Sequence, residues 1–210
     1  MRLKKIIKFI LFSLLILILI LKIRVEYFKY KWCQEQPVLI SVSVGDIIAR
    51  PNCNWFPSSE SSLFGGITGH MGLVVQDGQF TSDNETMGGL KIIEARLFAH
   101  QKPYYRNKVM VYNINENFGL KFRGRRFLLK THLNAAEKNR ILQQLSSFQN
   151  STYYVFSGKS GETINCVTLV WRLYSDVLEI DLDKNGGSIV YPNDIITHPL
   201  FDRNESKIRF

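Results

Sequence analysis

The sequence predicts an α+β domain preceded by one membrane-spanning helix. Three observations support this class: an apolar run close to the N-terminus, short strand-like segments in the first half, and two helix-like segments in the second half. Strands that precede helices, instead of alternating with them, favour α+β over a parallel βαβ sheet. With 210 residues, 45% of them hydrophobic, the chain is long enough for one domain with its own core.

The N-terminal apolar run extends from Phe9 to Leu21 and is interrupted only by Ser13. Isoleucines continue it past a lysine at each end, and lysine stems can lie along the apolar span, so we expect residues 6–23 to contact the bilayer. No small-x-small cleavage site follows, which favours an uncleaved single-pass anchor over a cleaved signal peptide. Basic residues on the two sides nearly balance. The short leading tail favours a cytoplasmic N-terminus and an extracytoplasmic domain.

Positive charge is concentrated in the same N-terminal region. The net charge is +9, of which residues 1–31 contribute +7 and the rest of the chain only +2. A nucleic-acid-binding surface on the folded part is therefore not expected. We divide the chain into an anchor and juxtamembrane segment, 1–33, and a folded domain, 34–210. A smaller basic run is expected to be a solvated hairpin turn, with approach to anionic headgroups as the alternative: Lys121, Arg123, Arg125 and Arg126.

The strand-like segments are rich in β-branched residues and are bounded by turn signals such as Gly45-Asp46 and Asp77-Gly78. The expected strands are Val38–Val44, Ile47–Ala49, Met71–Val75, Lys91–Ala95, Lys108–Tyr112 and Arg126–Lys130.

Two helices are expected in the second half. The first begins at Asn134, which forms a capping pair with Glu137, and its apolar face consists of Ile141, Leu142, Leu145 and Phe148. The second runs from Cys166 to Leu178, with apolar residues at helical spacing. Either Thr163 or Asn165 is placed to cap it.

Cys166 lies at the start of this second helix, where free backbone N–H groups and the helix dipole stabilise a thiolate and can hold an oxyanion. A thiol nucleophile also needs a base and a group that orients the base. His70 heads a strand between two glycines, and Glu94 ends the next predicted strand, from which a carboxylate can fix the tautomer of the imidazole. The alternatives are a small core cysteine, a half-buried histidine, and a surface Glu94 paired with Arg96 or Lys91.

Five segments in this order resemble the circularly permuted papain-like hydrolases of the NlpC superfamily, in the YiiX/YebB-like branch. They are VGDIIAR (44–50), GHMGLVV (69–75), IIEAR (92–96), YVFSGKSGETINCVTLVW (154–171) and YPNDI (191–195). The resemblance covers roughly residues 38–200, and the order histidine, acid, cysteine is that of the permuted members.

The resemblance implies a permuted papain-like fold, in which an antiparallel, barrel-like sheet packs against the helix that carries the nucleophile. It also implies a Cys166 nucleophile, a His70 base, a Glu94 orienting group, and Tyr154 lining the site near the oxyanion, although Tyr154 reads equally well as a core aromatic. Neither a cofactor nor a metal is implied. Asn165 stands where many peptidoglycan-cleaving relatives have aspartate, whereas a lipid-acyltransferase branch has Asn-Cys.

Three functions follow as hypotheses. The first is a membrane-anchored cysteine hydrolase that cleaves an amide, in a cell-wall peptide or a related molecule, through a Cys-His-Glu triad and an acyl-enzyme. The second is a lipid or lipoprotein acyl hydrolase or acyltransferase with the same triad. The third is a non-catalytic, membrane-anchored binding module with a structural Cys166. The loop Ser58–Gly66 is expected to form a wall of the cleft, and pairing of Cys33 with Cys53 stays open.

Overall fold

The computed structural model describes residues 2–33, 39–51, 69–82, 89–96, 108–119, 122, 126–149, 151–201 and 207–209. Its helices are α1 (Arg2–Cys33), α2 (Ile114–Phe118), α3 (Ala135–Phe148), α4 (Cys166–Leu178) and α5 (Pro192–Ile196), with a 3-10 turn, η3 (Pro199–Phe201). Its strands are β1 (Leu39–Val42), β2 (Ile47–Pro51), β3 (Gly69–Val74), β4 (Gly78–Thr81), β5 (Lys91–Arg96), β6 (Lys108–Asn113), β7 (Phe127–Leu129) and β8 (Lys207–Arg209).

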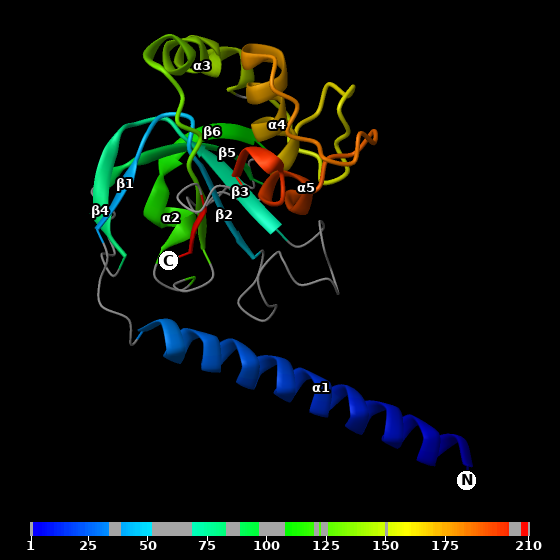
Figure 1. Ribbon diagram of the computed structural model, residues 1–210. Helices are drawn as coiled ribbons and strands as arrows, with labels where there is room; N and C mark the ends of the chain where they lie inside the picture. The colour runs from blue at the N-terminus through cyan, green and yellow to red at the C-terminus, as the bar shows by residue number, and fades with distance from the viewer. Residues whose placement is uncertain are drawn as a thin grey trace.

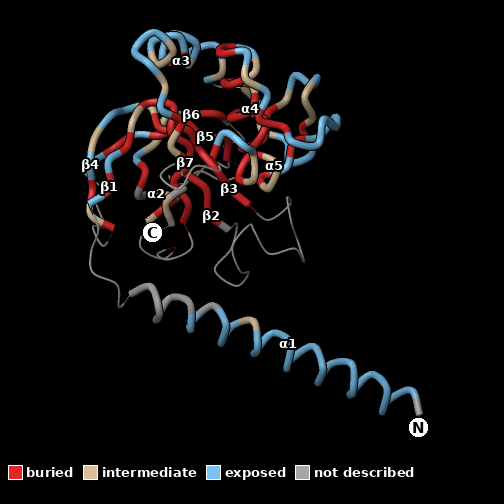
Figure 2. Tube along the Cα trace, in the orientation of Figure 1, coloured by how far each residue is buried: buried red, intermediate tan, exposed pale blue. Residues whose placement is uncertain are grey.

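Helix α1 contains the predicted apolar segment. Residues Leu3–Arg24 are long and apolar enough to cross a membrane, and none of that span is buried in the protein. Figure 2 shows this apolar segment as exposed along nearly its whole length, in contrast to the buried strands of the six-stranded sheet. The orientation of this helix in a membrane, and the division into an anchor (1–33) and a domain (34–210), stay predictions.

The remaining elements form an α+β body with two antiparallel sheets, as the sequence predicted. Six strands pair in the order β6-β5-β3-β2-β7-β8, and β1 pairs with β4 in a separate two-stranded sheet. All pairings between these strands are antiparallel. Each predicted strand overlaps an observed one. Strands β4 and β8 and the short helices α2 and α5 were not predicted, because segments of three to five residues carry little periodicity.

Both faces of the six-stranded sheet are buried, which gives the body three layers (Figure 1). On one face, alternate strand residues such as Ile47, Leu73 and Ile93 pack with α4 in the larger hydrophobic core. On the other face, Ile48, Val74 and their neighbours pack with β1, β4 and α2 in a second core. A strand with two buried faces has few positions where polar residues are tolerated without partners. Each polar side chain buried in this sheet is therefore expected to have a specific partner.

The two predicted helices are confirmed, with one difference in α3. Asn134 and Glu137 form the expected reciprocal capping box, and Asn165, not Thr163, caps α4. Helix α4 is buried along most of its length, as expected for a central helix. In α3, however, only Ile141 of the predicted apolar face is fully buried, whereas Leu142 is 39% exposed. The helix lies at the surface of the body and needs only a narrow apolar stripe.

The expected basic turn is wrong at Arg126, which is completely buried. Its guanidinium group donates hydrogen bonds to the carbonyl oxygens of Phe118, at 2.9 Å, and Ser82, at 3.0 Å. A buried guanidinium is tolerated when carbonyl groups satisfy its donors, so this arginine ties β7 to α2 and β4. The other basic residues of that run lie outside the described residues.

Candidate active site

Cys166 occupies the first position of α4, as predicted, but most of the nearby backbone donors are already used. The side-chain oxygen of Asn165 accepts hydrogen bonds from the N–H groups of Val167, at 2.9 Å, and Thr168, at 2.8 Å. Two of the backbone N–H groups expected to be free at this helix start are therefore occupied by the cap. Within the part of the chain that the structure describes, the N–H of Cys166 itself donates to no acceptor, so one backbone donor remains beside the sulfur.

The sulfur atom of Cys166 lies beside the beginning of β3. Among the described residues, β3 pairs with β5 at Leu73–Ile93 and Val74–Ile92, towards the end of β3. Cys166 Sγ is 3.9 Å from the carbonyl oxygen of Gly69, and the N–H of Met71 donates towards the sulfur. These contacts place the start of α4 against the strand that carries His70.

His70 and Glu94 meet inside the protein, as the sequence predicted. His70 Nε2 is 2.6 Å from Glu94 Oε2, and both residues are buried. The neighbouring Gly72 permits this approach: a Cβ atom there would lie 3.1 Å from the carbonyl oxygen of Ile93 and 3.4 Å from Glu94 Cβ. The ring of Phe118 stacks on the imidazole at 5.5 Å. Because Nε2 faces Glu94, Nδ1 is the ring nitrogen left to act on Cys166.

Glu94 has no exposed surface, and its two carboxylate oxygens contact different partners. Oε2 contacts His70, whereas Oε1 accepts from Arg96, whose Nε is 2.5 Å away. Burial alone would raise the pKa of Glu94, but the hydrogen bond and charge of His70, followed by those of Arg96, lower it to about 2. The surface pairing of Glu94 with Arg96, considered as an alternative from the sequence, thus exists as a buried contact that keeps the carboxylate ionised.

The thiol and the imidazole shift each other towards an ion pair. Burial alone would raise the pKa of Cys166, but the charge and hydrogen bond of His70 outweigh burial, so the pKa of the thiol lies below its ordinary value. Burial alone would lower the pKa of His70, but the Cys166 thiolate and the hydrogen bonds to Cys166 and Glu94 raise it above its ordinary value. The arrangement favours a thiolate facing an imidazolium.

Sequence reasoning missed Asn117 and Arg50, which lie beside this pair. Asn117 Nδ2 is 2.8 Å from both Glu94 Oε2 and His70 Nε2. Arg50 lies opposite His70 in the register of strands β2 and β3. Its side chain donates to the side-chain and backbone oxygens of Asn117. For Arg50, the only signal in the sequence was its place at the end of the VGDIIAR segment. Asn117 gave no signal, because it belongs to a five-residue helix without a distinctive pattern.

The expected place of Tyr154 near the oxyanion stays a prediction. The side chain of Tyr154 is 52% exposed and packs edge-on against Phe156. The preceding residue, Tyr153, is half-buried, and burial together with the charge of Cys166 raises the pKa of its hydroxyl. Alternation along an extended segment explains the difference, because neighbouring side chains point in opposite directions.

Two further sequence-based expectations, a cleft wall at Ser58–Gly66 and the pairing of Cys33 with Cys53, fall on residues that the structure does not describe. The loop Ser58–Gly66 and Cys53 lie outside the described residues, as does the side chain of Cys33. Among the described residues, Cys166 is a free, buried cysteine, and no group of three or more His, Cys, Asp and Glu side chains is arranged to hold a metal ion.

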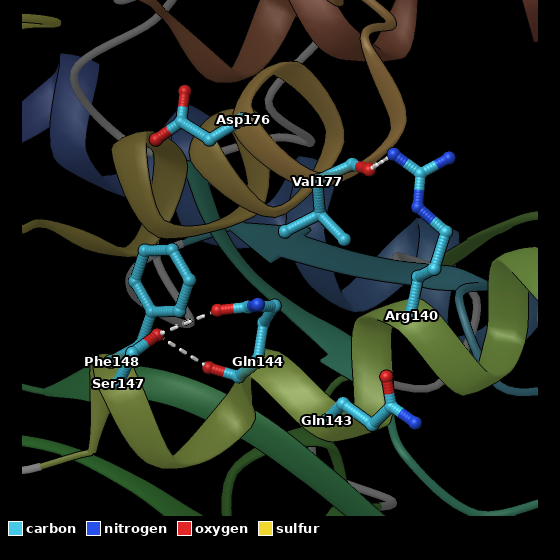
Figure 3. A pocket seen from close by; sticks show the side chains of 7 residues that line it. All are labelled: Arg140, Gln143, Gln144, Ser147, Phe148, Asp176 and Val177. Carbon is cyan, nitrogen blue, oxygen red and sulfur yellow. Dashed lines mark hydrogen bonds between the residues drawn. The ribbon is translucent and has the colours of Figure 1, made fainter.

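A polar groove of about 390 Å³ lies between α3 and α4, well away from Cys166. Figure 3 shows the side chains that line it: Arg140, Gln143, Gln144, Ser147, Phe148, Asp176 and Val177. The α4 residues of this groove belong to the last turns of the helix, whereas Cys166 begins it. The groove is therefore separate from the cluster around His70.

No protein-family model matches this chain, and no curated protein matches it. Among solved structures, the chain is similar to the crystal structure of metalloprotein YiiX from Escherichia coli O157:H7. The TM-score is 0.48 and the sequence identity 15%, and the match covers 75% of this chain and 93% of that chain. At this level the likeness concerns the broad course of the backbone.

Proposed function

We propose that the protein is a membrane-anchored thiol hydrolase of the permuted papain-like NlpC type, in its YiiX/YebB-like branch, and that it cleaves an amide in a cell-wall peptide or related molecule. The observation that carries the proposal is a buried His70–Glu94 pair that lies close enough to a cysteine at a helix N-terminus for His70 and Cys166 to shift the pKa of each other. A structural cysteine in a core needs neither an imidazole beside it nor a carboxylate behind that imidazole.

In the proposed reaction, the Cys166 thiolate attacks the carbonyl carbon of the amide, and the carbonyl π electrons move to oxygen. The N–H of Cys166 donates to this oxyanion. The oxyanion then collapses, the carbon–nitrogen bond breaks, and Nδ1–H of His70 gives its proton to the departing amine. His70 next takes a proton from water, which attacks the thioester, and the carboxylic acid leaves with the thiolate restored. Glu94 accepts from Nε2–H throughout and holds the tautomer.

The alkylation of Cys166 by iodoacetamide across pH tests this proposal. We use the full chain in detergent with Cys33→Ser and Cys53→Ser, so that only Cys166 reacts. The thiolate should form well below the ordinary cysteine pKa of about 8.5. In His70→Asn the midpoint should move above that value, because burial then acts without the opposing imidazolium.

His132→Asn provides the matched control, since His132 is exposed and its positive φ of 53° suits asparagine. Its alkylation profile should equal that of the parent protein. A Cys166 that reacts only after denaturant is added contradicts the enzyme proposal and supports the third hypothesis, an anchored binding module.

A second candidate function, acyl hydrolysis or acyl transfer on a lipid or lipoprotein, is favoured by one exposed apolar turn. Val155 and Phe156 are 48% and 68% exposed and follow the exposed Tyr154. The turn is hydrogen-bonded to the residue before the nucleophile, because Asn165 Nδ2 donates to the carbonyl oxygens of Val155, at 3.1 Å, and Ser157, at 3.2 Å. An apolar surface held by the residue next to the nucleophile suits an acyl chain better than a polar peptide.

This second candidate predicts a dependence on chain length. Wild-type protein should hydrolyse p-nitrophenyl octanoate faster than the acetate ester. Phe156→Ser should lower that ratio by about tenfold, since each methylene that loses apolar burial costs about 0.8 kcal/mol. Rates with p-nitrophenyl acetate should be unchanged. Leu142→Ser, on the exposed side of α3, is the control. An octanoate-to-acetate ratio that is the same in all three proteins removes the reason for preferring a lipid substrate.

A further inference from the structure

We infer that Asn117 is a positioning residue of the site: its side-chain amide donates to Glu94 and so fixes the carboxylate that orients His70 towards Cys166. The inference rests on the proposed function for its meaning in catalysis, but its geometry is independent of the substrate. Asn117 belongs to α2, whereas His70 and Glu94 belong to β3 and β5, so it joins a third element to the pair.

The orientation of the Asn117 amide is determined by Arg50. Arg50 Nε donates to the backbone oxygen of Asn117 at 2.5 Å, and its Nη2 donates to Asn117 Oδ1. A guanidinium group has donors only, so the amide oxygen must face Arg50 and the amide nitrogen must face the other way. Asn117 Nδ2 therefore points at Glu94 Oε2 and His70 Nε2, each 2.8 Å away.

When Glu94 is ionised, its Oε2 atom is the acceptor that both neighbours share: His70 Nε2–H and Asn117 Nδ2–H each donate to it, and it has lone pairs for both. The 2.8 Å approach of Asn117 Nδ2 to His70 Nε2 then joins two donors and is not a hydrogen bond. With Nε2 protonated, Nδ1 is the nitrogen that exchanges a proton with Cys166. The three charged groups that act on His70 come from three packed elements: Cys166 of α4, Arg50 of β2 and Glu94 of β5. Asn117 is an uncharged side chain beside these three charged groups.

Two substitutions of Asn117 test its role: one adds a negative charge beside His70, and the other removes the donor without adding charge. Asn117→Asp keeps the shape of the side chain and the oxygen that accepts from Arg50, but it replaces the donor by a second negative oxygen beside Nε2. A carboxylate at this distance stabilises the imidazolium, so the pKa of His70 should rise by about one to three units. Asn117→Leu removes the donor without adding charge. It should slow alkylation of Cys166 at neutral pH by about tenfold, the loss expected for a hydrogen bond to a charged group.

The experiment is a titration of His70 by NMR in the full chain labelled with 15N-histidine, combined with the alkylation profile of Cys166. Asn113→Asp is the matched control: Asn113 precedes α2, is exposed, and makes no side-chain capping bond. We expect the titration of His70 to move up in Asn117→Asp and to stay at the wild-type position in Asn113→Asp.

The inference is overturned if His70 titrates in Asn117→Asp as it does in the wild type, because position 117 then has no effect on His70. It is also overturned if Asn113→Asp shifts the pKa of His70 equally, because the shift then reflects only the change in net charge. Failure of the proposed function gives a different signature. In that case wild-type Cys166 is unreactive at every pH, while the His70 titration in the two aspartate variants still decides the role of Asn117.

Discussion

Replacement of Cys166 by alanine should lower the hydrolysis of p-nitrophenyl acetate by at least about a thousandfold, because the covalent step then has no nucleophile. In wild-type protein, the first turnover should leave one acetyl group on the enzyme, and peptide mapping should place it on Cys166. The expectation follows from the thiolate beside His70 and from the backbone N–H left beside the sulfur.

The other two cysteines of the chain provide controls for this experiment. Cys33→Ser and Cys53→Ser should each leave both the rate and the acetylated peptide unchanged. Surface lysines also react slowly with activated esters, so the peptide map, and not the total mass gain, identifies the nucleophile. Retention of hydrolysis in Cys166→Ala, or acetylation distributed over lysines alone, would rule out the acyl-enzyme in the proposed reaction.

Much of the candidate site was predictable because its parts have local signals. The capped, amphipathic segment from Cys166 to Leu178 predicts α4, and the β-rich segments around His70 and Glu94 predict their strands. The contact between His70 and Glu94 depended on β3 and β5 being neighbours. It holds because the intervening strand, β4, leaves the six-stranded sheet and pairs with β1.

The rest of the site depends on contacts that no local pattern reveals. Asn117 meets His70 across 47 residues and Arg50 across 67, and it lies in a helix too short to show periodicity. The same limit explains Arg126, which appears in the sequence as part of a solvated basic run. Its burial depends on distant carbonyl oxygens, among them those of Phe118 and Ser82, to which its guanidinium group donates.

Loss of the Glu94 carboxylate should destabilise the fold as well as the site. Glu94→Ala removes the negative charge that contacts both Arg96 and His70 in a buried environment. Breaking such a pair costs about 3–5 kcal/mol of unfolding free energy. Arg96 then keeps its stacking on Tyr112, with 3.6 Å between the guanidinium carbon and the ring centre, but loses its carboxylate. Urea unfolding followed by tryptophan fluorescence measures the difference, and Glu162→Gln, at an exposed position, is the control.

The pH dependence of this loss separates the charge of Glu94 from its packing. In the folded protein the pKa of Glu94 is about 2, below the ordinary value of 4.5, so the unfolded chain binds more protons between these values. The stabilisation by Glu94 is therefore complete above about pH 5 and disappears as the pH falls through 2. The gap between wild type and the nearly isosteric Glu94→Gln should narrow over the same interval. A gap that stays constant from pH 6 to pH 2 would mean that Glu94 acts by shape and hydrogen bonding alone, and the ionised carboxylate behind His70 would have to be abandoned.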